Sequence, residues 1–93
     1  MRRSVVMKSF DYIATPPGTT IEEQLKDRGM SQEEFAMRMN MPVEQISKLI
    51  NGKVLLTPDI AESLERVLGT PAKFWNKLEV IYREKLAKIE NGK

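Results

Sequence analysis

Apolar residues recur every three or four positions through most of the chain after residue 18, which is the spacing of one helix face. Gly, Pro, Asn, Ser and Thr break this pattern at the places where helices typically begin and end. The pattern predicts an all-α fold, a compact five-helix domain over residues 16–93. The expected boundaries are Thr19 or Thr20 to Gly29, Ser31 to Asn40, Pro42 to Asn51-Gly52, Thr57-Pro58 to Gly69, and a long C-terminal helix over residues 71–90.

The second and third predicted helices are separated by only three residues, Asn40, Met41 and Pro42. Asn tolerates the left-handed backbone conformation found just past a helix end. A residue before Pro is pushed out of helical geometry, and Pro presets φ for the next helix. Two short helices joined in this way must pack their apolar faces together at a steep angle, which is the helix-turn-helix arrangement.

The outer face of the third helix is mostly polar, and a helix of this size fits the major groove of DNA. The side chains expected to read base edges are Val43, Gln45, Ser47 and Lys48. The free N–H groups at the start of the second helix suit a phosphate oxygen. The residues expected to contact phosphates are Ser31, Gln32, Arg38, Asn51 and Lys53. Many small helical bundles contain a similar turn and bind no DNA, so the turn alone leaves both interpretations open.

The composition and charge of the chain exclude several classes of functional site. The 93 residues carry a net charge of +2, which favours an anionic partner only weakly, and residues 19–51, where the DNA contacts are expected, sum to −2. The chain has no Cys and no His, which excludes disulfides, His-containing catalytic triads and His-ligated zinc. The pairs Glu22-Glu23 and Glu33-Glu34 fall in predicted first helical turns, where negative charge complements the helix dipole. We therefore expect no catalytic residues, no metal and no cofactor.

The first 15 residues are set apart by the turn-forming sequence TPPGTT at 15–20. They form an N-terminal arm with weak period-2 character that is either strand-like, pairing on dimerisation, or disordered. No apolar run approaches the ~20 residues that span a bilayer. Lys8 interrupts the first apolar stretch too early for a signal peptide. The expected location is the cytoplasm, without membrane association.

The last predicted helix carries an apolar stripe at helical spacing. Phe74, Trp75 and Leu78 are expected to close the core over the helix-turn-helix. The later residues Tyr82, Leu86 and Ile89 extend beyond so small a core, and a second copy of the chain is their simplest partner. A homodimer whose recognition helices lie about 34 Å apart matches adjacent major grooves on one face of DNA.

The segment QEEFAMRMNMPVEQISKLIN at 32–51 resembles the helix-turn-helix of the lambda-repressor-like (XRE) superfamily along its whole length. Ala36 stands at the close-packing position, and Ile46 and Leu49 are the inward residues of the recognition helix. One departure is Asn40 where the family usually has Gly. A second is Glu44 on the recognition face, which repels phosphate and needs a base amino group as donor.

A narrower resemblance covers residues 16–82 and involves several motifs together. The chain is similar to HigA-type antitoxins of bacterial toxin–antitoxin modules in Pro-Gly before the first helix, Ser-Gln-Glu-Glu-Phe-Ala, Asn-Gly-Lys, Thr-Pro-Asp and Phe-Trp-Asn-Lys-Leu-Glu. This resemblance implies a homodimer that binds a palindromic operator in its own promoter and represses transcription. It also implies a ribonuclease toxin that the antitoxin neutralises.

Two alternatives stay open beside that interpretation. FDYIATPPG and FWNKLEVIYREKLAKIE also resemble the start of longer regulators in which this module precedes a zinc peptidase-like domain. The other alternative is a protein-interaction module with vestigial DNA binding, favoured by the acidic central segment and Glu44.

Overall fold

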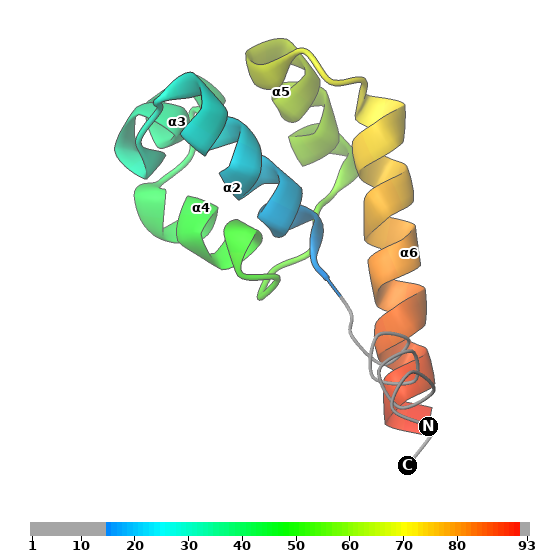
Figure 1. The fold of residues 1–93 in the computed structure, drawn as a ribbon. Coiled ribbons are helices and arrows are strands. Elements are labelled where there is room, and N and C mark those ends of the chain that lie inside the picture. Colours follow the sequence, from blue (N-terminus) through cyan, green and yellow to red (C-terminus); the bar gives the residue numbers. More distant parts are fainter. Residues whose placement is uncertain (1–14, 92–93) are drawn as a thin grey trace, which may run out of the picture.

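The computed structural model describes residues 15–91, and all the regular secondary structure in that range is helical (Figure 1). The all-α fold class is confirmed. The first 14 residues of the predicted arm lie outside the described range. The helices are α2 (Pro17–Arg28), α3 (Gln32–Met39), α4 (Val43–Ile50), α5 (Pro58–Leu68) and α6 (Ala72–Asn91).

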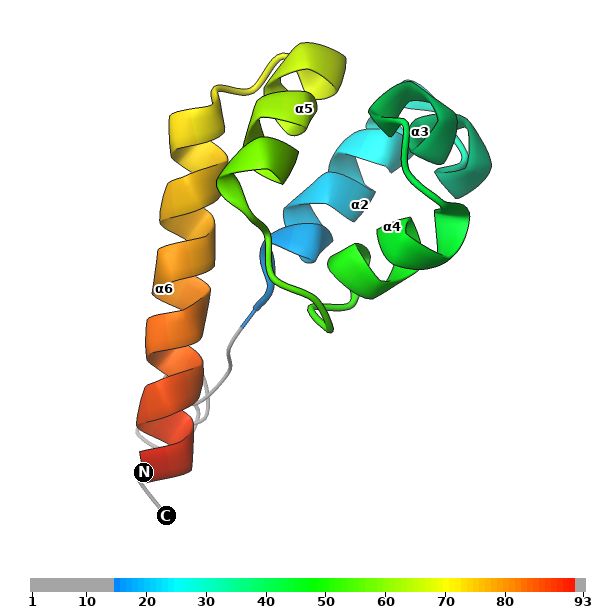
Figure 2. The same ribbon diagram turned by 180° about the vertical axis from the view of Figure 1, so that it is seen from behind.

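Helix α2 packs on both α4 and α6. Helix α3 packs on α4 and α5, and α5 packs on α6. Both ribbon views show α6 as the long helix at one side, with its C-terminal part extending beyond the rest of the bundle (Figures 1 and 2). None of the helices between residues 15 and 91 is long and apolar enough to cross a membrane.

One hydrophobic core joins all five helices. Its largest fully buried side chains are Trp75, Phe35, Ile21, Ile46 and Leu64. Burial of each such side chain contributes about 1.5–3 kcal/mol. The Trp75 indole N–H has no hydrogen-bond partner among the described residues, so the indole contributes by packing alone.

The predicted helix ends are confirmed where a left-handed residue stops the helix. Gly29, Asn40 and Gly69 all have positive φ at a helix C-cap. The predicted start of the first helix is wrong. Helix α2 begins at Pro17, ahead of both threonines, because Pro supplies a helical φ at the first position and loses no intrahelical bond there. Glu22 and Glu23 therefore lie beyond the first turn.

Side chains of α2 and α5 fix the connection into α6. Arg28 Nη2 donates to the carbonyl of Leu68 at 2.6 Å, at the C-terminal end of α5. The Glu65 carboxylate accepts from the backbone N–H of Ala72 at 3.0 Å, which satisfies a free donor at the start of α6. These contacts set the direction in which α6 leaves α5.

Two expectations about α6 need correction. Phe74 does not close the core: it is 42% exposed and lies edge-on to the buried Trp75, with the ring centroids 5.3 Å apart. Tyr82 does not face outward: it is only 9% exposed within the single chain. The helix is rotated so that the Trp75, Leu78 and Tyr82 side packs inward, while Leu86 and Ile89 are half-buried.

The backbones of α2 and α4 approach each other most closely at Gly18. A Cβ atom placed on Gly18 would lie 2.0 Å from the carbonyl oxygen of Ile50 and 2.3 Å from its Cα. No side chain fits in that space, and backbone atoms cannot yield as a flexible side chain would. The absence of a side chain at residue 18 therefore fixes how closely α2 and α4 pack.

We predict that Gly18→Ala destabilises the protein by about 3 kcal/mol, the upper range for overpacking, because α2 must move away from the end of α4. Gly29→Ala is the matched control. Its Cβ meets no atom within 4 Å, so only the left-handed backbone opposes it, at about 1 kcal/mol. Chemical denaturation followed by the fluorescence of Trp75 measures both. Equal losses would show that the helices do not approach as described.

Candidate nucleic-acid interface

The turn between α3 and α4 is built as the sequence predicted. Asn40 has φ 58° and ψ 45°, the left-handed conformation, and its N–H donates to the carbonyl of Met37 at 3.1 Å. The N–H of Met41 donates to the carbonyl of Ala36 at 3.0 Å. Pro42 has φ −63° and precedes Val43, the first residue of α4. The helix end, the left-handed residue and the proline together reverse the chain within three residues.

Helix α4 buries one side in the core and leaves the other residues half-buried or exposed. Ile46 is 0% exposed, Leu49 is 2% exposed and Ile50 is 5% exposed. The four residues predicted to contact bases occupy the remaining surface of the helix, with Val43 and Gln45 flanking the buried side. Val43 and Lys48 are exposed, while Gln45 and Ser47 are half-buried. All four are on one eight-residue helix, whose orientation is fixed by the three buried residues.

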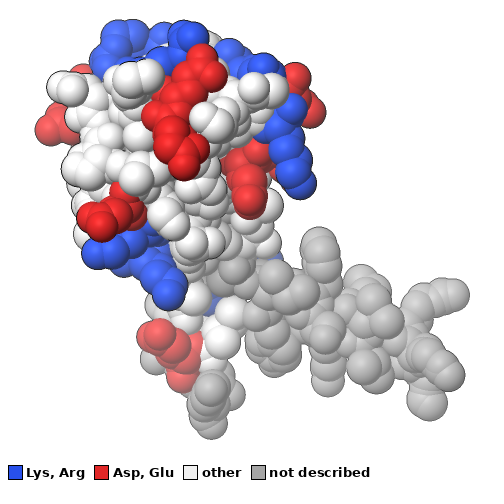
Figure 3. Space-filling view, turned by 90° about the vertical axis from the view of Figure 1, so that its left-hand side faces the viewer, with Lys and Arg blue, Asp and Glu red and all other residues white. Residues whose placement is uncertain are grey.

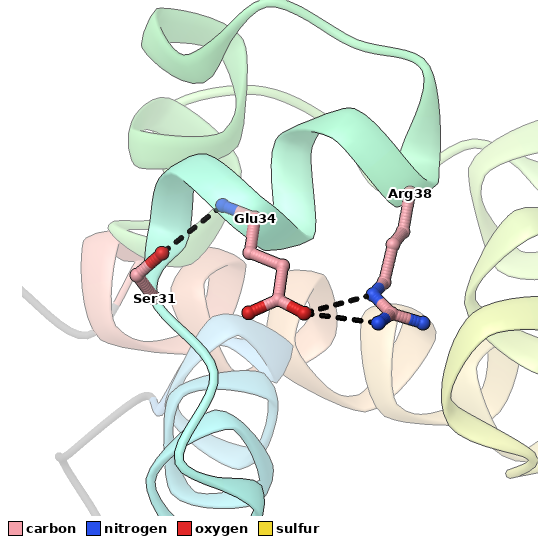
Figure 4. A network of polar contacts seen from close by, with 3 residues as sticks. All are labelled: Ser31, Glu34 and Arg38. Carbon is pink, nitrogen blue, oxygen red and sulfur yellow. Dashed lines mark hydrogen bonds and ion pairs between the residues drawn. The ribbon is translucent and has the colours of Figure 1, made fainter.

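Ser31 and Arg38, both predicted to contact phosphate, have intramolecular partners on α3 (Figure 4). The Ser31 hydroxyl accepts from the backbone N–H of Glu34 at 3.1 Å and so caps α3. The guanidinium of Arg38 donates to Glu34 Oε2 from Nη2 at 2.9 Å and from Nε at 3.3 Å. The Glu34 carboxylate thus pairs with Arg38. Such an exposed pair is worth under about 1 kcal/mol, so a phosphate can compete for Arg38 at small cost.

The other predicted phosphate contacts lie at two separate places. Gln32 is the first residue of α3 and is half-buried. Asn51 and Lys53 are exposed in the segment that follows α4. The N–H of Lys53 donates to the carbonyl of Lys48 at 2.8 Å, which folds this segment back onto the end of α4. The structure therefore separates the predicted phosphate contacts between the start of α3 and the loop after α4.

A hollow of about 540 Å³ beside the turn was not predicted from the sequence. Its apolar lining includes Met37, which is 77% exposed, and Val43, which is 40% exposed. Met37 does not share the helix face of the buried residues Phe35, Ala36 and Met39. An apolar residue off that face is the sequence signal that could have indicated this exposed position. The hollow extends the surface of α4 toward α3. Its lining residues are Glu33, Ala36, Met37, Asn40, Met41, Pro42 and Val43.

Charges of both signs are mixed over the side of the molecule that carries α3 and α4 (Figure 3). Glu44 is exposed in the first turn of α4, between Val43 and Gln45. An acidic side chain there repels phosphate and accepts a hydrogen bond from a base amino group. Among residues 15–91, no group of three metal-ligating side chains is placed to hold a metal ion.

The family comparison matches this part of the chain. The model of a family described as Helix-turn-helix matches residues 21–75. A protein of Escherichia coli (strain K12) described as an uncharacterized HTH-type transcriptional regulator, YddM, is 36% identical over 63 residues. That alignment covers 68% of this chain and 67% of the relative.

Solved structures of similar proteins share the fold. An addiction module antidote protein of a HigA family from Coxiella burnetii has a TM-score of 0.77 and 29% identity, covering 85% of this chain and 87% of the other. A putative antidote protein of a plasmid maintenance system from Nostoc punctiforme has a TM-score of 0.78 and 28% identity, covering 82% and 84%. The Pseudomonas aeruginosa antitoxin HigA, solved with the higBA promoter, has a TM-score of 0.80 over 86% and 88% of the two chains; at 23% identity it supports the fold alone.

We predict that Asn40→Gly leaves stability unchanged or raises it slightly, because Gly adopts the left-handed conformation without strain. Asn40→Ala should cost about 1 kcal/mol, since the same φ brings its Cβ close to the backbone. Thermal unfolding of both variants, monitored by circular dichroism, measures the difference. An Asn40→Ala variant as stable as Asn40→Gly would contradict the left-handed turn.

Proposed function

Because the chain belongs to the Helix-turn-helix family matched over residues 21–75, we propose that it is a sequence-specific DNA-binding transcriptional repressor. The observation that carries this proposal is the division of α4, whose inner residues are buried while its outer residues face away from the core. A short helix fixed in this way and carrying hydrogen-bonding side chains is what readout of the major groove requires. The proposal includes no catalytic activity.

The start of α4 offers three adjacent side chains for reading bases. Val43 presents an apolar surface, continuous with the hollow at Met37, which suits the methyl group of thymine. Glu44 accepts from an amino group, such as that of cytosine. Gln45 can bond adenine in a bidentate manner. We therefore propose an operator in which thymine and an amino-bearing base lie at the positions that the start of α4 reaches.

The finer proposal is that the chain is an antitoxin that represses its own operon and neutralises a ribonuclease toxin. Two of the similar structures, at 28% and 29% identity, are described as antidote proteins. The shared fold covers most of each chain. The product of the gene beside this one should arrest growth as a ribonuclease when expressed alone, and co-expression with this chain should relieve that arrest. Unrelieved arrest despite soluble expression of both proteins would contradict the toxin partnership.

A homodimer is part of the proposal, and we propose a different surface for it from the one expected from the sequence. Phe74, Val80 and Ile81 are 42%, 54% and 45% exposed on the outer side of α6. Charged residues continue the same side at helical spacing, as Lys77 and Glu84 do. When two copies of α6 pack antiparallel about the point between residues 80 and 81, Lys77 of each copy lies opposite Glu84 of the other. Of the residues first expected there, Leu86 and Ile89 are half-buried and continue the inward side of α6 that carries Trp75 and Tyr82, so they lie outside this surface.

The proposed function is tested by fluorescence anisotropy with the duplex upstream of the gene and a scrambled duplex, over a series of salt concentrations. Binding to the upstream duplex should be at least about 10³-fold tighter than to the scramble. Affinity should fall steeply with salt as counterions are released. Equal and weak binding to both duplexes would overturn the repressor and favour the second candidate, a module whose partner is a protein. The acidic Glu33 and Glu44 beside the turn favour that candidate.

We predict different signatures for the two kinds of contact. Gln45→Ala should reduce discrimination between operator and scramble by about 1–3 kcal/mol, the value of one base contact. Lys53→Ala should weaken both duplexes similarly and lower the salt slope by about one unit, since it removes one phosphate contact. If Gln45→Ala discriminates between the duplexes as the parent does, Gln45 does not read a base. If Lys53→Ala keeps the parent's salt slope, Lys53 does not contact a phosphate.

We predict that Ile81→Glu converts the dimer to a monomer, because it places charge at the centre of the proposed α6 contact. Leu55→Glu is the matched control, since Leu55 is a 61% exposed apolar residue outside α6. Lys77→Glu should weaken the dimer through two symmetric like-charge contacts, and adding Glu84→Lys should restore it. Sedimentation equilibrium gives the mass of each variant. Failure of the double exchange to restore the dimer would exclude the antiparallel register.

A further inference from the structure

The loop after α4 leads from the base-reading helix into residues 51–57, and Asn51 and Lys53 lie at its start. Main-chain bonds hold its first part on α4: the N–H of Gly52 donates to the carbonyl of Leu49 at 3.2 Å, and the N–H of Lys53 to that of Lys48 at 2.8 Å. The next hydrogen-bonded main-chain group, the carbonyl of Val54, is bound by a side chain of α6 instead. The loop is therefore held from two helices that are distant in sequence.

The side chain that binds the loop is Arg83. Its Nη2 donates to the carbonyl oxygen of Val54 at 3.3 Å, and its Nε donates to Glu79 Oε2 at 2.7 Å. The side chain of Glu79 is only 12% exposed and that of Arg83 34%, so water screens this pair less than a surface pair. The guanidinium also lies 4.8 Å from the centroid of the Tyr82 ring. These contacts fix the planar guanidinium before it meets the loop.

Tyr82 sets the distance between the loop and α6. A Cβ atom on Gly52 would lie 2.8 Å from the Tyr82 hydroxyl oxygen and 2.9 Å from the Cβ of Pro16. Gly52 also has φ +73°, a conformation that other residues adopt with strain. The loop at Gly52 therefore lies directly against α6 and the residue that precedes α2.

We infer that Arg83 is a positioning residue for DNA binding: by holding the Val54 carbonyl, it keeps the loop in the conformation from which Lys53 reaches a phosphate. This inference rests on the proposed function. Lys53 is exposed and lies one residue before the bound carbonyl. Fixing the main chain beside a long side chain lowers the entropy lost when that side chain binds. Arg83 therefore acts through Lys53 and does not itself touch DNA.

A double-mutant cycle tests this dependence directly. Operator affinity is measured by anisotropy for the parent, Arg83→Met, Lys53→Ala and the double variant. Each single variant should lose roughly three- to fivefold in affinity and about one unit of salt slope, the share of one phosphate contact. The double variant should bind no worse than Lys53→Ala alone, because the loss caused by Arg83→Met passes through Lys53.

Controls separate positioning from charge and from folding. Arg66→Met removes the same charge and side chain from the last turn of α5, away from the loop, and should retain nearly the parent salt slope. Arg83→Lys keeps the charge but cannot donate to Glu79 and to the Val54 carbonyl at once, as the planar guanidinium does. This variant should therefore still lose operator affinity. Melting temperatures, recorded for every variant, set the assay temperature below all transitions.

The outcomes separate this inference from the function on which it rests. Additive losses in the cycle, or an Arg83→Met variant that binds like the parent, would overturn the positioning role while leaving the repressor intact. A parent chain that does not distinguish the operator from the scrambled duplex would overturn the repressor itself, and the positioning role with it. Non-additive losses with an unaffected Arg66→Met control would establish the positioning role.

Discussion

The close packing of α2 against the end of α4 at Gly18 is the constraint on which the rest of the structure depends. Gly18 lets the backbone of α2 come within van der Waals distance of Ile50. The inner residues of α4 are buried between α2 and α3, and their burial decides which side of the helix faces outward. The loop after α4 and the start of α2 then meet α6 at Tyr82, so the position of the recognition helix and that of α6 are set by one connected contact region.

This connection gives α6 two roles on two sides of the same helix. Its inner side carries Trp75 and Tyr82 into the core and Arg83 to the loop. Its outer side exposes Phe74, Val80 and Ile81, the surface proposed for a second copy. A homodimer formed there would fix the two loops and the two recognition helices at one separation, because each loop is bound to the helix that pairs. The spacing of half-sites would then follow from the packing of α6.

The charges around the turn favour selective binding over tight non-specific binding. Glu34 pairs with Arg38, and Glu44 lies among the residues proposed to read bases. A cationic surface attracts the phosphates of any duplex, whatever its sequence. These acidic groups weaken that attraction, so contacts to bases make up a larger part of the binding free energy. Such a balance suits a repressor that must distinguish one operator from bulk DNA.

The sequence by itself determined the helices, the turn and the family. Apolar spacing predicted five helices, and Asn40-Met41-Pro42 predicted the turn, because local backbone preferences and one-sided burial decide these features. Only the tertiary structure decided the rotation of α6 and the hold of Arg83 on Val54. These depend on contacts between residues far apart in the chain, or on which of several permitted partners a long side chain reaches. Periodicity shows that a residue belongs to an apolar stripe, but only packing decides which part of a wide stripe faces inward, as Phe74 and Tyr82 show.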